Sequence, residues 1–117
     1  MFMQHVTIYT ADVEASVKFY QDVVGLTIED DRRPAAPMVF LANKKGETCI
    51  ELIGVPADQA YTGGGLAIGF YTENVEAEHE RLTAMGLNPT DFICPGPNVK
   101  FFFVKDPSGV TVQLIRE

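Results

Sequence analysis

Two side chains that can exchange protons or pair with charged groups lie in segments predicted to be β-strands. Glu51 alternates with apolar residues in the segment 48–53. His5 lies in the segment 4–9, which is rich in β-branched residues. A carboxylate is unusual on a strand face that closes an apolar core. Glu51 is therefore a candidate to accept a proton from a substrate or to pair with a cationic ligand, and the alternative is a solvated strand face.

Three other groups are weaker candidates. Cys49 shares the strand face of Glu51, but no positive neighbour that would lower its thiol pKa is identifiable, so a small apolar wall residue is favoured over a nucleophile or soft ligand. His79 lies on the apolar stripe of a predicted helix, and we expect it to be packed away from the site. The run 101–103, three phenylalanines, places rings on both faces of its strand. Those rings form either an aromatic platform for a planar or cationic ligand, or core and dimer packing.

An internal repeat organises the chain. The segment AIGFYTENVEA at 67–77 echoes HVTIYTADVEA at 5–15, at a constant shift of 62 residues. The same shift aligns residues 50–52 with 112–114. It also aligns Val39-Phe40-Leu41-Ala42 with Phe101-Phe102-Phe103-Val104. We expect one domain, 1–117, built from modules 1–56 and 65–117 and a flexible connector, 57–64, that contains glycines.

Each module is predicted to have the order β-α-β-β-β. Asp12 and Asn74 are suited to cap the two helices, and Gly25 and Gly86 to end them. Residues 94–98 are predicted to form a loop. The predicted helices are 13–24 and 75–85, and the predicted strands are 4–9, 26–29, 38–42, 48–53, 66–71, 87–93, 99–105 and 110–115.

Alternation along these strands places candidate ligand-facing residues on the sheet faces opposite the helices. If the two modules lie side by side, these faces line a shared concave cleft, which is the usual place for a small ligand. The first and last strands of each module each contribute one position to these faces, and the four positions are His5, Glu51, Ala67 and Gln113. The predicted cleft lining is Thr7, Tyr9, Cys49, Ala67, Gly69, Tyr71, Phe101, Phe103 and Thr111.

Composition restricts the class of partner. The formal net charge is −7, which disfavours nucleic acid and anionic membranes as partners. No apolar run approaches the length of a membrane span, and the N-terminal residues lack the pattern of a secretory signal. We therefore expect a cytoplasmic protein in which Cys49 and Cys94 are free thiols.

The chain resembles the vicinal oxygen chelate superfamily, which includes glyoxalase I, bleomycin-resistance proteins, fosfomycin-resistance enzymes and extradiol dioxygenases. The resemblance is carried by HVTIYTADVEASVKFYQDVVGL near the start, VKDPSGVTVQLI near the end, and the doubled β-α-β-β-β order. It implies an α+β fold with a curled mixed sheet around a cleft, and a homodimer whose cleft forms within or across chains. One scaffold hosts many activities, so the fold does not fix the function.

In enzymes of that superfamily, four side chains hold a divalent metal, usually His or Gln, Glu, His and Glu. The resemblance carries these roles to His5, Glu51, Ala67 and Gln113. Ala67 cannot coordinate, and Gln113 offers only a neutral carbonyl oxygen. His5, Glu51 and Gln113 would therefore hold at most one weakly bound zinc, nickel, manganese or iron ion, and no other cofactor is expected.

Three functions follow from this degraded metal site. The favoured one is a protein that binds or sequesters a hydrophobic or cationic compound, with Glu51 as its charge partner. The second is a metal-dependent, glyoxalase-like lyase or isomerase in which Glu51 is the catalytic base. The third is a non-catalytic subunit that binds a protein partner.

Overall fold

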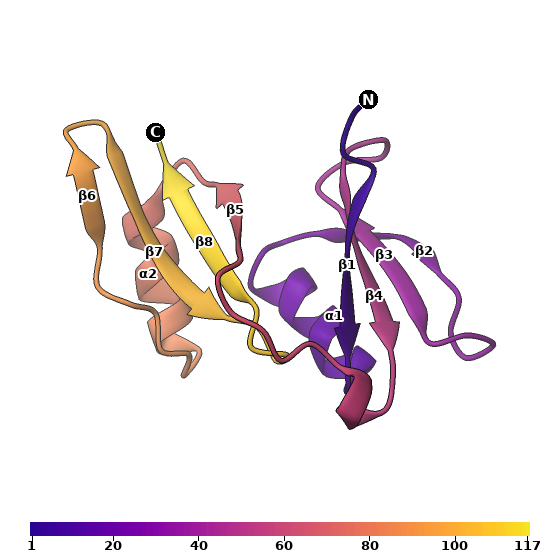
Figure 1. Cartoon of the computed structure of the whole chain (residues 1–117). Coiled ribbons are helices and arrows are strands. Elements are labelled where there is room, and N and C mark those ends of the chain that lie inside the picture. The colour runs from indigo at the N-terminus through magenta and orange to yellow at the C-terminus, as the bar shows by residue number, and fades with distance from the viewer. The chain divides into compact units, whose positions relative to one another are not determined.

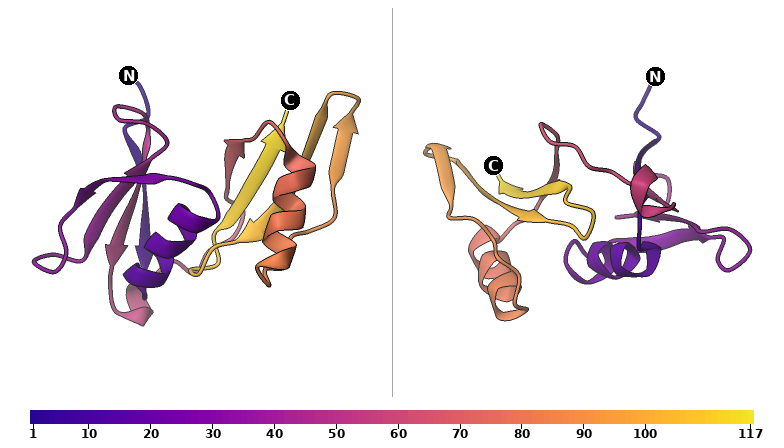
Figure 2. Two further views of the ribbon diagram at one scale, coloured as in Figure 1. Left: turned by 180° about the vertical axis from the view of Figure 1, so that it is seen from behind. Right: turned by 60° about the horizontal axis from the view of Figure 1, so that its bottom comes forward.

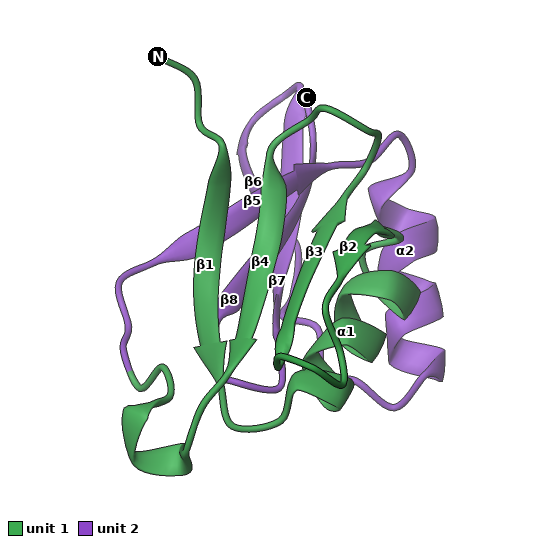
Figure 3. Ribbon diagram, turned by 90° about the vertical axis from the view of Figure 1, so that its right-hand side faces the viewer, with its two compact units in different colours: residues 1–62 green, residues 63–117 purple.

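The computed structural model describes all 117 residues, which form two compact units. Figure 1 shows the course of the chain, and Figure 3 shows unit 1, residues 1–62, in green and unit 2, residues 63–117, in purple. Each unit contains one α-helix and one four-stranded mixed sheet in the order β-α-β-β-β, which confirms the predicted α+β class and the repeat. Neither helix has the length and apolar character needed to cross a membrane.

Unit 1 is a sheet in the strand order β1-β4-β3-β2. β1 pairs parallel to β4, and the other neighbours are antiparallel. Its elements are β1 (His5–Thr10), α1 (Val13–Asp22), β2 (Thr27–Asp31), β3 (Met38–Ala42), β4 (Cys49–Gly54) and the short 3-10 helix η1 (Ala57–Gln59).

Unit 2 repeats this arrangement in the order β5-β8-β7-β6, with β5 parallel to β8. Its elements are β5 (Ala67–Tyr71), α2 (Val75–Ala84), β6 (Ile93–Gly96), β7 (Val99–Lys105) and β8 (Thr111–Arg116).

Both helices begin where predicted, and they end at Asp22 and Ala84, two residues and one residue before the predicted ends. The Asp12 carboxylate accepts a hydrogen bond from the Ala15 amide at 3.0 Å, and the Asn74 side chain accepts one from Ala77 at the same distance. These bonds satisfy amides that have no partner within the helix. Gly25 and Gly86 follow the helices with φ of 81° and 84°, a conformation that a side chain would strain.

Each helix covers one face of its own sheet. α1 contacts β3 and β4, and α2 contacts β7 and β8; both helices lie over their sheets in the view from behind in Figure 2. The residues between helix and sheet are almost all apolar and buried. They include Tyr20, Leu41 and Leu52 in unit 1 and Leu82, Phe102 and Val112 in unit 2. The opposite face of each sheet is not covered by its own helix, and we call it the open face.

The predicted alignment of the repeat is wrong in one strand pair. Val39 lies opposite Leu52, whereas Phe102 lies opposite Leu114. Val39 therefore corresponds to Phe102, a shift of 63, although the two leucines are 62 apart. The cause is the hairpin after β7, residues 106–110, which is one residue shorter than residues 43–48. Because strand side chains alternate, a slip of one residue exchanges the faces.

The other differences lie in irregular segments. Residues 87–92 form no strand, whereas the predicted loop 94–98 contains most of β6. Pro89 cannot donate to a ladder, so pairing begins after it. The predicted flexible connector also contains η1.

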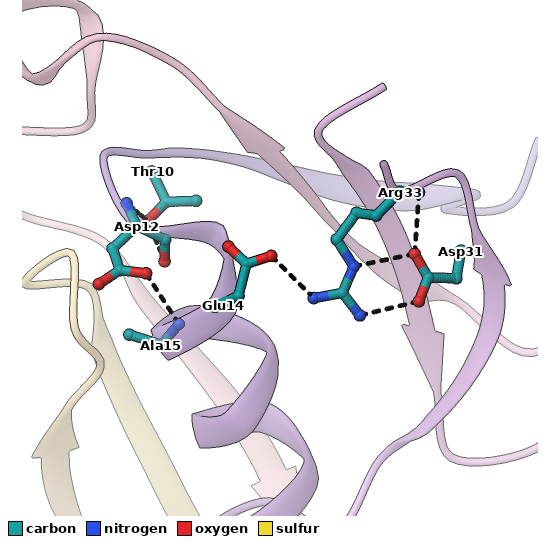
Figure 4. Close-up of polar contacts among 6 residues, drawn as sticks. All are labelled: Thr10, Asp12, Glu14, Ala15, Asp31 and Arg33. Atoms are coloured by element: carbon teal, nitrogen blue, oxygen red, sulfur yellow. Dashed lines mark hydrogen bonds and ion pairs between the residues drawn. The ribbon is translucent and has the colours of Figure 1, made fainter. Parts of the chain in front are cut away.

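An ion-pair group joins α1 to the end of β2 (Figure 4). The Arg33 guanidinium donates to both carboxylate oxygens of Asp31, at 2.9 and 2.8 Å, and lies 3.4 Å from the Glu14 carboxylate. The Asp31 carboxylate also accepts from the Arg33 backbone amide at 3.0 Å. Hydrogen bonding to Arg33 lowers the pKa of Asp31 from 3.8 to about 2.

We expect an NMR titration of the Asp31 carboxyl to give a pKa of about 2. The folded-state pKa lies below the ordinary value, so the stabilisation is present above pH 3.8 and is lost as the pH falls toward 2. Arg33→Gln should return the pKa toward 3.8, and Arg33→Lys, which keeps the charge without the two-pronged contact, should return it in part. A wild-type pKa near 3.8 would contradict this assignment.

Candidate functional site

Four side chains, one from each strand, form a row across the open face of unit 1. Thr7 lies opposite Glu51, Glu51 lies opposite Phe40, and Phe40 lies opposite Asp30. We call Thr7, Glu51, Phe40 and Asp30 the Glu51 row. Neighbouring strands lie about 4.8 Å apart, so adjacent members of the row can contact one another.

The Glu51 carboxylate is buried but only half satisfied. Glu51 is 8% exposed. The Thr7 hydroxyl donates a hydrogen bond to its Oε1, and His5 Nε2 lies 3.4 Å from the same atom. Oε2 has no partner within the chain, and it is not fully buried. Oε2 therefore keeps access to the open face.

Two aromatic side chains, Phe40 and Tyr9, are neighbours of Glu51 in the strand register. The ring of Phe40 lies 6.0 Å from that of His5 in an edge-to-face arrangement. The Arg32 guanidinium lies 5.4 Å from the centre of the Phe40 ring, and its Nε donates to Asp30 at 3.2 Å. Tyr9 lies on the same face, two residues beyond Thr7, and is 49% exposed. An acceptor atom is thus held among apolar and cation-attracting groups.

Cys49 lies beside this group as a neutral thiol. It is half-buried and opposite His5 in the strand register, and its Sγ lies 3.6 Å from the Glu47 carbonyl oxygen. Burial raises the pKa of the Cys49 thiol, and the negative charge of Glu29 raises it further. A raised pKa disfavours a nucleophile, which supports the predicted role of an apolar wall residue.

The equivalent row of unit 2 lacks a charged group. Gln113 lies between Gly69 on β5 and Phe103 on β7. A Cβ at residue 69 would lie 2.8 Å from Gln113 Oε1, so the glycine provides the space in which this amide rests. Ala67 is exposed and, by alternation with Ile68, faces away from α2.

The three phenylalanines of β7 divide between the faces. Phe101 and Phe103 lie on the open face with their ring centres 5.5 Å apart, together with Tyr71, which is 65% exposed, and Thr111. Phe102 is buried on the helix side. The run therefore places rings on both faces of its strand, as predicted.

His79 is a packing residue, as expected. Its ring lies 4.5 Å from Phe92 and 4.9 Å from Phe102, and its Nε2 is 2.9 Å from the Thr90 carbonyl oxygen. It joins α2 to the segment before β6, on the helix side of unit 2.

The side chains do not fit the divalent metal centre that the resemblance implies. No three His, Cys, Asp or Glu side chains gather in a group able to hold a metal ion. His5 and Glu51 are the only predicted donors in unit 1, and Glu51 Oε1 is already engaged by Thr7. Unit 2 offers the amide of Gln113 and the methyl group of Ala67. A catalytic zinc site usually has three protein ligands.

The sequence interpretation missed two members of the site. The constant shift of 62 aligns Phe40 with Phe102, a core residue, because this shift does not allow for the shorter second hairpin. Comparing the two hairpin lengths would have aligned Phe40 with Phe103. Arg32 follows β2 in a segment without periodicity, so no pattern placed it over Phe40.

Comparisons with known proteins agree with the fold. Residues 3–114 match the model of the Glyoxalase/Bleomycin resistance protein/Dioxygenase superfamily. The chain is 29% identical to the lactoylglutathione lyase of Haemophilus influenzae, with 98% of this chain and 92% of that protein covered.

Two solved structures show the same fold. Leishmania major glyoxalase I, described as trypanothione-dependent, has a TM-score of 0.82 and 22% identity, covering 100% of this chain and 87% of that one. TnmS3, an antibiotic-binding protein from Streptomyces sp. CB03234, has a TM-score of 0.77 and 22% identity, covering 97% and 93%.

Thr7→Val should destabilise the protein by about 1–3 kcal/mol, because it removes a hydrogen-bond donor from a buried carboxylate. Urea denaturation at neutral pH measures this change, and Thr7→Ser is the matched control that keeps the donor. Combining Thr7→Val with Glu51→Leu should recover most of the loss, since neither polar partner then remains. Equal stability of the wild type and Thr7→Val would contradict this account.

Proposed function

Because the chain belongs to the glyoxalase/bleomycin resistance protein/dioxygenase superfamily, we propose that it captures a small hydrophobic or cationic compound at the Glu51 row. The observation that carries this proposal is the half-satisfied carboxylate. The Glu51 carboxylate is buried, one oxygen is held by the chain, and the other is left for a partner from outside. A buried charge is costly unless it is paired, so its retention favours a ligand-binding role over a packing role.

The surroundings of Glu51 support capture rather than turnover. Phe40 and Tyr9 supply ring surface for an apolar body, and Cys49 supplies a small wall. Metal-dependent chemistry lacks support in the donor set, since Ala67 and Gln113 stand where the resemblance implies strong ligands. TnmS3, which has the same fold, is an antibiotic-binding protein, and this supports a capture role for a chain with this fold.

We propose the same ligand-binding role for the open face of unit 2. Phe101, Phe103 and Tyr71 offer apolar surface there, and Gln113 offers a neutral amide. Ala67, Gly69 and Thr111 line the same face. The homodimer and the cytoplasmic location remain predictions.

One alternative has a specific observation in its favour. The lactoylglutathione lyase relative and the 3.4 Å contact between His5 Nε2 and Glu51 Oε1 favour a glyoxalase-like lyase or isomerase. In that function Glu51 is the base, and His5, Glu51 and Gln113 are the donors available for a metal.

A thermal-shift screen of small apolar and cationic compounds tests capture. We expect hits that raise the melting temperature of the wild type and lose most of their effect on Glu51→Gln, which removes the charge but keeps the shape. Glu80→Gln, an exposed substitution on α2, is the matched control and should respond like the wild type. A screen without hits would favour a protein-binding subunit.

Metal analysis separates capture from lyase activity. Protein purified without chelators should carry less than one equivalent of zinc, nickel, manganese or iron, and adding these ions should leave the melting temperature unchanged. One tightly bound equivalent that is lost in both His5→Gln and Glu51→Gln would overturn the capture proposal in favour of the lyase.

A further inference from the structure

The two oxygens of Glu51 have different surroundings, and the difference restricts the ligand. Both contacts that the chain makes to this carboxylate, from the Thr7 hydroxyl and from His5 Nε2, go to Oε1. Oε2 is the one unpaired atom of a group that is 8% exposed. The chain therefore presents a single acceptor atom, directed to the open face.

A charged donor suits this atom better than a neutral one. A carboxylate strengthens the hydrogen bond from any donor, but a cationic donor also gains charge attraction, which is weakly screened where water is largely excluded. Arg32 is engaged with Asp30 and lies over Phe40. No lysine or arginine of the chain forms an ion pair with Glu51.

The neighbouring ring fixes where the body of the ligand lies. Phe40 is directly opposite Glu51 on β3, so the two side chains start about 5 Å apart. The Arg32 guanidinium over the Phe40 ring shows that this surface already accommodates a cation. Exposed Tyr9 flanks the carboxylate diagonally, from β1. A ligand that donates to Oε2 thus places the adjoining part of its body against aromatic rings.

From this geometry we propose that the Glu51 row recognises an arylalkylamine, a protonated amine one or two carbons from an aromatic ring, and that Thr7 is the positioning residue that turns Oε2 toward it. This inference rests on the proposed capture function and specifies its ligand class. The ammonium group donates to Oε2, and the ring lies against the exposed Tyr9 and the part of the Phe40 ring that Arg32 does not cover. Thr7 holds Oε1 and does not touch the ligand.

Three probes of matched size test the ligand class. Phenethylamine carries both features, phenethyl alcohol keeps the ring without the charge, and cyclohexylethylamine keeps the charge without the aromatic ring. Titrations followed by NMR should give phenethylamine a dissociation constant at least about tenfold lower than that of either matched probe. The amide signals of Thr7, Phe40 and Glu51 should shift on binding.

Variants assign the preference to individual groups. Glu51→Gln should bring phenethylamine and phenethyl alcohol to within about twofold of each other, whereas Glu80→Gln should keep the tenfold ratio. Thr7→Val should reduce the ratio and Thr7→Ser should restore it, which a purely structural role for Thr7 would not produce. Thermal unfolding of each variant confirms that it is folded.

The outcomes separate this inference from the function on which it rests. Equal binding of the amine and the alcohol by the wild type would overturn the arylalkylamine class and leave capture intact. The same conclusion would follow if none of the three probes bound but compounds of another class in the wider screen did. A ratio that survives Glu51→Gln would overturn the role of Oε2. Absence of binding in both the probe series and the wider screen would overturn both.

Discussion

The parallel pairing of β1 with β4 is the constraint on which the site depends. It sets Thr7 opposite Glu51, so that a hydroxyl donates a hydrogen bond to one oxygen of the buried carboxylate. Antiparallel pairing of β4 with β3 then adds Phe40 on the other side of the acid. Because strand side chains alternate, the same register that directs these groups outward directs Ile8, Leu52 and Val39 into the core.

Most of the fold could be predicted because its signals are local. The Asp12 and Asn74 caps, the glycines that end the helices, and the alternation within β3 and β7 all lie within short windows of sequence. The misplaced features depend on distant pairing. β6 is too short and too rich in proline and glycine to show alternation, and its partner strand decides where pairing begins. Repeat alignment failed in β3 because hairpin length, rather than residue identity, sets the register there.

The candidate site could be predicted only as far as the alternation of side chains along a strand shows which face of the sheet each one lies on. His5, Thr7 and Glu51 were placed on one face of unit 1, and the structure places them in contact. No pattern in the sequence indicates that both contacts to Glu51 go to Oε1 and none to Oε2. This arrangement depends on side-chain conformations across two strands that are 44 residues apart. The position of Arg32 above Phe40 depends on the path of an irregular segment, which local propensity does not determine.

The glycine at position 69 has a consequence for how the second unit could acquire a new specificity. Its missing side chain leaves a hollow on β5 that the amide of Gln113 fills. A methyl group there would displace only the flexible tip of that amide, so the backbone need not move. The residue at position 69, rather than Gln113 itself, thus determines whether this amide rests against β5 or projects toward a ligand. Divergence between the duplicated halves can proceed through such neighbours while the scaffold stays the same.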